Sequence, residues 1–152
     1  MSMLKEMYST ELRDHLGEVL DEVEKTKFPV ITKKKVAGGS KEYAIISRAI
    51  LQHKILRYLV KDEFLVEVYK EQDNTVTLSM PFFGIAVNGE NINEATKELI
   101  EDLKMYAEDY KKDIDAYLKS PNRKDHLIPL LQLSFCDTDE EIIKLLKYNN
   151  NG

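Results

Sequence analysis

The sequence predicts an α+β fold built from two small modules. A chain of 152 residues, 43% hydrophobic and 32% charged, has the composition of a globular protein and the length of one ordinary domain or two small ones. Stretches with helical spacing of apolar residues alternate with short β-branched runs, in two separate groups. The charge balance changes sign between these groups. Together, the three observations predict one module over residues 1–61 and a second over residues 63–152.

The two parts of the chain differ strongly in charge. Residues 1–61 contain 12 Lys and Arg residues against 8 Asp and Glu residues, a net charge of +4, whereas residues 62–152 contain 10 against 19, a net charge of −9. The stretch 25–61 holds ten of these cations and one acid. When Lys and Arg side chains bind phosphates, the counterions condensed on those phosphates are released, and this release favours binding. A polyanion is therefore the expected partner of a basic module. The alternative is that these cations belong to an ordinary solvated surface, which can carry the same number of charges without binding a polyanion.

The first module is predicted to be helix, strand, strand, helix. Apolar residues at helical spacing predict a helix over 10–23, and β-branched residues predict strands over 30–33 and 43–47. The glycine-containing segment 34–42 between them is predicted to be a flexible connection, and residues 48–60 a second helix. A unit of this size buries little apolar surface. We therefore expect it to self-associate, most simply as a twofold dimer, with a higher homo-oligomer also possible.

The second module is predicted to be an antiparallel sheet with one long packed helix. Apolar residues recur at helical spacing from Ile92 to Tyr117, and Asn91 followed by Glu94 forms a capping-box pattern at the start of that helix. A second capping box, Thr138 with Glu141, opens a final helix that is predicted to reach Tyr148. The predicted strands of this module are residues 64–70, 75–80, 82–87 and, at a sheet edge, 127–135.

The first module resembles the N-terminal domain of Phd/YefM antitoxins. The resemblance covers about residues 7–60 and rests on the Ser-x-Glu-x-Arg start at residues 9–13, the Pro-Val-Ile-Thr-Lys sequence at 29–33 and the second strand. It implies a dimer that binds operator DNA. By the same resemblance, Arg13 contacts DNA and Lys33 replaces the basic residue that follows the Ile-Thr pair of the family. Lys34 and Lys35, in an unusually long hairpin, join them as the predicted DNA-binding residues; the alternative is that the three lysines only keep the hairpin soluble.

The second module resembles a HicB-type antitoxin domain. The matching pieces cover about residues 63–119: two strands ending at Pro81, a third from Gly84 to Gly89, and the Asn-Ile-Asn-Glu-Ala start of the long helix. This resemblance implies a domain related to ribonuclease H-like folds but without their catalytic carboxylates. Its acidic surface suits a basic protein partner, and ribonuclease toxins are commonly basic because they bind RNA. The alternative interpretation is that these acids only keep the domain soluble.

Catalytic and cofactor chemistry is not indicated. His15, His53 and His126 lie on three different predicted elements, and the glycine patterns of nucleotide-binding loops are absent from the sequence. Cys136 has no local base that would activate its thiol, and as the single cysteine it favours a reducing, cytoplasmic compartment. No apolar run is long enough to span a membrane. We therefore expect no catalytic residue, metal, cofactor or membrane association.

These features predict a type II antitoxin. The first module would dimerise, bind operator DNA and repress the operon of the protein, and the second would neutralise a cognate toxin, expected to be a ribonuclease. A transcriptional repressor without a toxin partner is the alternative within the same class. A small enzyme with a cleft in the second module is the alternative from a different class, and convergent carboxylates in an apolar pocket would favour it.

Overall fold

The protein has two compact units, each with its own sheet and core. The computed structural model describes residues 3–150 and divides into a first unit, residues 1–55, and a second unit, residues 56–152. Both units combine helices with a small sheet, so the predicted α+β class is confirmed. The division lies inside a helical segment, whereas the predicted boundary between residues 61 and 63 lies beyond the end of that segment. In the described residues, no helix is both long enough and apolar enough to cross a membrane.

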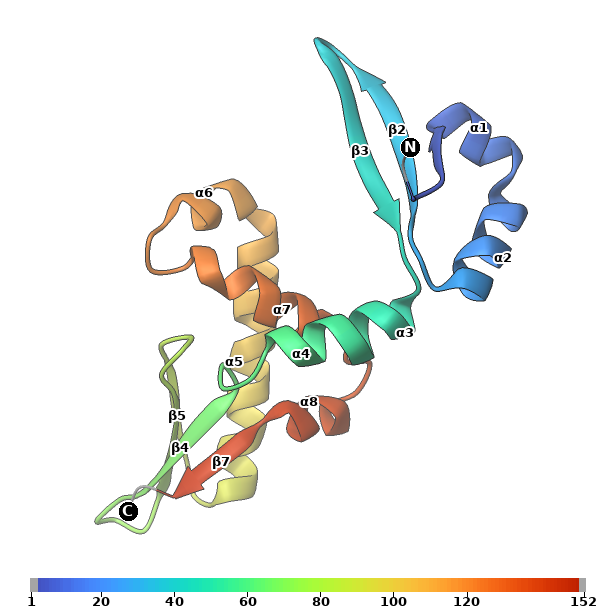
Figure 1. The fold of residues 1–152 in the computed structure, drawn as a ribbon. Helices are drawn as coiled ribbons and strands as arrows, with labels where there is room; N and C mark the ends of the chain where they lie inside the picture. Colours follow the sequence, from blue (N-terminus) through green and yellow to red (C-terminus); the bar gives the residue numbers. More distant parts are fainter. Residues whose placement is uncertain (1–2, 151–152) are drawn as a thin grey trace. The chain divides into compact units, whose positions relative to one another are not determined.

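The first unit is a three-stranded sheet with two short helices beside it (Figure 1). The strand order is β1-β2-β3, with β1 parallel to β2 and β2 antiparallel to β3. The helical segment that follows contains six π-helical residues and continues into the second unit. The elements are β1 (Glu6–Tyr8), α1 (Ser9–Asp14), α2 (Leu16–Thr26), β2 (Val30–Val36), β3 (Gly39–Ile45), α3 (Arg48–Ile50), η1 (Leu51–Leu56) and α4 (Arg57–Leu59).

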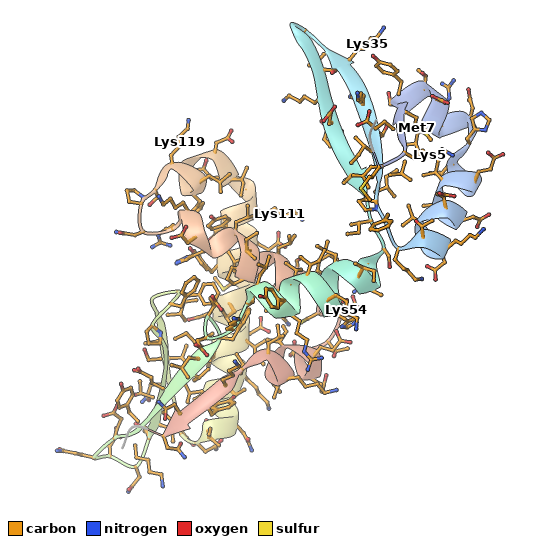
Figure 2. The ribbon with its side chains drawn as sticks, viewed as in Figure 1. Lys5, Met7, Lys35, Lys54, Lys111 and Lys119 are labelled. Carbon is orange, nitrogen blue, oxygen red and sulfur yellow. The ribbon has the colours of Figure 1, made fainter. Side chains whose placement is uncertain are left out.

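The core of the first unit is small. Val19 and Val23 of α2 pack against Met7 of β1 and Val30 of β2, and all four side chains are buried (Figure 2 labels Met7). The predicted single helix over 10–23 is wrong, because the backbone leaves the helical conformation at His15 and separates α1 from α2. Strand β1 was not predicted. Its three residues are too few to show the alternation that identifies a strand, and they become a strand only by pairing with β2.

The hairpin β2–β3 is longer than predicted. Residues that the sequence assigns to a flexible connection continue the antiparallel ladder, with Lys34 opposite Lys41 and Val36 opposite Gly39. Only Ala37 and Gly38 form the turn. Gly38 and Gly39 have φ values of 85° and 153°, a region that glycine reaches without a steric penalty. The two glycines therefore close a tight turn, and the strands remain paired up to it.

The second unit is a four-stranded sheet packed on a long helix. The strand order is β6-β5-β4-β7, and β7 runs parallel to β4 while the other neighbours are antiparallel. The elements are β4 (Leu65–Lys70), β5 (Val76–Met80), β6 (Ile85–Gly89), α5 (Ile92–Lys112), α6 (Ile114–Lys119), η2 (Lys124–His126), α7 (Leu127–Ser134), α8 (Asp139–Leu145) and β7 (Lys147–Asn150).

Helix α5 covers the sheet as the sequence predicts. The Asn91 side chain accepts a hydrogen bond from the backbone N–H of Glu94 at 3.0 Å, which confirms the predicted cap. Leu99 and Leu103 of α5 are fully buried in the same cluster as Leu78 of β5. A Cβ atom at Gly89 would lie 2.5 Å from the backbone nitrogen of Ala95, so the close turn from β6 into α5 requires glycine there.

The C-terminal quarter differs from the prediction in two places. Residues 127–135 were predicted to be an edge strand, but residues 127–134 form helix α7. Pro129 is compatible with this helix because it lies in the first turn, where its missing N–H is not needed. The final helix ends at Leu145 instead of Tyr148, and residues 147–150 form a parallel strand beside β4. The Tyr148 hydroxyl shares a 2.9 Å hydrogen bond with the Thr96 hydroxyl of α5, which ties this strand to the helix.

A cluster of aromatic side chains surrounds a buried histidine in the second unit. His126 Nδ1 lies 2.5 Å from the hydroxyl of Tyr106, and the His126 ring is 5.0 Å from that of Phe82. Arg123 lies over the rings of Tyr106 and Tyr117. Burial, together with the positive charge of Arg123, lowers the pKa of His126 below its usual value. Folding therefore favours the neutral imidazole.

The stability of the second unit should fall in mild acid. Because the folded pKa of His126 lies below the unfolded value, the unfolded chain binds the proton more readily, and stability is lost as the pH falls below about 6.5. Urea unfolding at pH 7.5, 6.5 and 5.5 should show this loss in the wild type and a smaller loss in His126→Gln. His15→Gln, at an exposed site, is the matched control. An equal loss in all three proteins would contradict the assignment.

Candidate nucleic-acid interface

The positive charge of the first unit is concentrated in the hairpin. Divided at the contact boundary, residues 1–55 carry ten cations and eight acids and residues 56–152 carry 12 and 19, so the net charges are +2 and −7. Within the first unit, residues 30–45 hold four lysines and one acid, a net charge of +3. Helices α1 and α2, residues 9–26, hold two cations and six acids, a net charge of −4. The hairpin is therefore the candidate anion-binding element.

The alternation of strand residues divides the lysines between the two faces of the hairpin. Lys34 is directly opposite Lys41 in the ladder, so their side chains leave the same face. Lys33 and Lys35 leave the other face. The three consecutive lysines predicted from the sequence therefore do not form one surface. The structure pairs Lys34 with Lys41 instead.

Lys33 lies between two carboxylates. Its Nζ atom is 3.3 Å from Glu6 Oε2 on β1 and 3.5 Å from Glu42 Oε1 on β3. Hydrogen bonding and charge attraction from Glu6, with a smaller contribution from Glu42, raise the pKa of Lys33 above its usual value. Its side chain is 29% exposed, the least of this group. Lys33 therefore links all three strands of the sheet, and its charge is balanced within the protein.

The other three hairpin lysines extend into solvent. Lys35 lies toward the distal end of the hairpin, with its Nζ atom 5.5 Å from the centre of the Tyr8 ring (Figure 2). Lys34 and Lys41 are exposed, and neither forms an ion pair with a carboxylate of the described residues. These ammonium groups remain available to an external anion.

Arg13 lies on a different element from the predicted lysines. It is on helix α1, its side chain is 78% exposed, and its Nε atom is 3.3 Å from Asp14 Oδ1. The neighbouring helical residues are mostly acidic. Arg13 therefore projects from the acidic part of the first unit, whereas Lys34, Lys35 and Lys41 project from the basic part.

Sequence reasoning left two features of this site unidentified. Tyr8 supplies the ring beneath Lys35, and Lys41 pairs with Lys34 across the ladder. The Gly38-Gly39 sequence is the signal that identifies the pairing. A tight turn at these glycines fixes the register, and the register places Lys41 opposite Lys34.

The second unit contains an apolar groove of about 780 Å³ between α5, α7 and α8. Leucines and isoleucines dominate its lining, and Glu108 is the one carboxylate among the described residues that line it. The converging carboxylates that would indicate an enzyme are not found at this groove. Elsewhere in residues 3–150, no three His, Cys, Asp or Glu side chains gather as a metal site would require.

Comparison with known proteins identifies the chain as a member of a family of antitoxins. The model of the PHD-like family, described as "Antitoxin of toxin-antitoxin, RelE / RelB, TA system", matches residues 3–148. The chain therefore belongs to this family, and the antitoxin predicted from the sequence is confirmed at this level. The match extends over both units, whereas the Phd/YefM resemblance noted from the sequence covers the first unit alone. Comparison with curated proteins gives no match.

A solved structure supports the same class. The crystal structure of the antitoxin part of a proposed toxin/antitoxin system from Syntrophomonas wolfei subsp. wolfei superposes with a TM-score of 0.77 at 25% sequence identity. The alignment covers 97% of this chain and 99% of that one. The fold is therefore similar to that of a solved antitoxin over nearly the full length of both chains.

Replacing Lys33 should destabilise the sheet of the first unit. In Lys33→Ala, Glu6 and Glu42 lose their shared cation and repel each other, so we expect a lower thermal midpoint than in the wild type. In a Glu6→Gln/Glu42→Gln background the same substitution should cost less, since no carboxylate is then left unpaired. Lys25→Ala, at an exposed position on α2, is the control. Equal losses in both backgrounds would show that Lys33 acts independently of these carboxylates.

Proposed function

We propose that this antitoxin binds operator DNA as a dimer in the cytoplasm, represses its own operon and neutralises a cognate ribonuclease toxin. The observation that carries the proposal is the separation of charge within one antitoxin chain: a basic hairpin in the first unit and a net charge of −7 on the second. A chain with these two surfaces is suited to two partners of opposite charge, a nucleic acid and a basic protein.

The support for DNA binding is the exposed lysines of the hairpin. Lys34, Lys35 and Lys41 project into solvent from a paired ladder. A paired backbone has less conformational entropy to lose than an unpaired loop when its lysines contact phosphates. Arg13 is the fourth proposed contact, on the resemblance to Phd/YefM antitoxins, and Lys33 is proposed to act mainly by holding the hairpin on β1.

The support for a dimer is unburied apolar surface. On α2, Leu16 and Leu20 are 48% and 50% exposed, and they lie one turn apart on one side of the helix. In the segment 48–59, Tyr58 and Leu59 are 72% and 52% exposed. Strand β3 is also an edge strand of its sheet. Association of two chains through the sheet and this helical segment would cover such surfaces.

The support for toxin binding is the acidic second unit. Its long helix α5 carries four lysines and six acids, and the acids lie on a largely exposed side. These acids are Glu94, Glu98, Glu101, Asp102, Glu108 and Asp109. The three antiparallel strands followed by a capped helix agree with the HicB-like layout predicted for this part of the chain. We propose that this unit neutralises the toxin by covering its RNA-binding surface.

The chain should bind duplex DNA from directly upstream of its own gene. We expect Arg13→Ala to weaken this binding severalfold without lowering the thermal midpoint, because the exposed side chain contributes to no core contact. Fluorescence anisotropy at a fixed salt concentration measures the affinity. Affinity of Arg13→Ala equal to that of the wild type would remove Arg13 from the interface.

The gene should neighbour one that encodes a small basic protein. Expression of that protein alone should arrest growth, and co-expression of this chain should restore it, because the antitoxin binds and blocks the toxin. Copurification of the two proteins checks direct binding. If no neighbouring product is toxic while DNA binding persists, the alternative of a repressor without a toxin partner is the correct one.

A further inference from the structure

We infer that the β2–β3 hairpin is a two-stranded ribbon that enters the major groove of duplex DNA tip first, with Lys34, Lys35 and Lys41 on the phosphates at the groove rim. This inference rests on the proposed DNA binding and adds the element that performs it. The hairpin is thereby the element of the first unit that reads the bases.

The length of the hairpin matches the depth of the groove. A strand rises about 3.4 Å per residue, so Lys34 lies about 10 Å from the turn at Ala37. The major groove is about 8.5 Å deep. With the tip at the groove floor, Lys34, Lys35 and Lys41 lie near the level of the phosphates. Figure 1 shows that the distal part of the hairpin extends beyond α1 and α2, so the helices of the unit leave this part uncovered.

The thickness of the hairpin and the division of its lysines favour entry tip first. A sheet with its side chains is about 10 Å thick, and the major groove is about 12 Å wide. Phosphates line both walls of the groove, and the hairpin carries lysines on both faces, Lys34 with Lys41 on one and Lys35 on the other. A ribbon lying flat on the groove floor would use the lysines of only one face. Entry tip first uses all three.

The Lys34–Lys41 pair indicates an anionic ligand. Like charges directly opposite in a ladder destabilise a hairpin, and no carboxylate of the described residues compensates this pair. On the other face, by contrast, Lys33 is fully compensated by Glu6 and Glu42. The same hairpin thus holds one balanced cation beside β1 and an unbalanced pair farther out.

The tip is small enough to approach base edges. The turn and its flanking pair consist of Val36, Ala37, Gly38 and Gly39, and a Cβ at either glycine would meet no atom within 4 Å. Ser40 adds one hydroxyl, which donates or accepts at a base edge, and the Val36 and Ala37 side chains suit contact with a thymine methyl group. The acidic helices α1 and α2, at a net charge of −4, are poorly suited to the same position.

The test compares two double variants of the full chain that lose the same charge. Lys34→Ala/Lys41→Ala removes the exposed hairpin pair, and Lys97→Ala/Lys119→Ala removes two exposed lysines of the second unit (Figure 2 labels Lys119). Binding to a fluorescent 30-base-pair duplex from upstream of the gene is measured between 50 and 200 mM salt. We expect the hairpin variant to bind about tenfold more weakly, with the log–log salt slope reduced by about 2 for each hairpin bound, and the control variant to match the wild type.

Two further measurements separate binding from folding and identify the groove. The thermal midpoint of the hairpin variant should equal or exceed that of the wild type, because a like-charge pair has been removed. Methyl green, which occupies the major groove, should compete with the wild type, and netropsin, which occupies the minor groove, should not. An unchanged salt slope in the hairpin variant, competition by netropsin alone, or equal binding to polyglutamate would overturn the inference. Failure of the wild type to bind any duplex would instead overturn the proposed DNA-binding function.

Discussion

The period of two residues in a strand is the constraint on which the candidate interface depends. It sends Lys33 to one face of the hairpin, where Glu6 and Glu42 bind it, and Lys34 to the other, where only Lys41 is opposite. One consecutive run of lysines thus performs two different tasks. The inner lysine links three strands, and the outer ones remain free in solvent. A shift of the hairpin register by one residue would move Glu42 away from its place opposite Lys33, and it would put Lys41 opposite Lys33 or Lys35 instead of Lys34.

Much of the fold follows from local sequence signals, and the parts that do not follow depend on contacts distant in sequence. Long apolar periodicity and two capping boxes identify α5 and α8, because both signals arise within the helix itself. Strands β1 and β7 carry no such signal. Each is short and forms because a parallel neighbour, β2 or β4, offers its free edge. Helix α7 is mostly apolar even at its exposed positions Ile128 and Leu131, so its sequence shows no period that distinguishes a helix from a strand.

For the candidate site, composition identifies the residue type but not its position. The net charge of +4 over residues 1–61 is correct as a count, yet it averages an acidic helical pair with a basic hairpin. Moving the boundary from residue 61 to residue 55 transfers Arg57 and Lys61 to the second unit and lowers the charge of the first to +2. The electrostatic field at a surface depends on which element carries each charge, and only the pairing of β2 with β3 gives that information.

The distribution of charge also explains how a small unit tolerates a hairpin with an unbalanced pair of like charges. Among the residues that the structure describes, the core of the first unit contains four buried apolar side chains, so little stability is available to offset repulsion between Lys34 and Lys41. The Glu6–Lys33–Glu42 ion pairs lie one ladder position closer to the core, where they hold β1, β2 and β3 together. Repulsion is thereby confined to the distal hairpin, beyond the strands that the core requires. A phosphate bound between Lys34 and Lys41 would attract both ammonium groups and offset their mutual repulsion. The hairpin would therefore be most stable when DNA is bound.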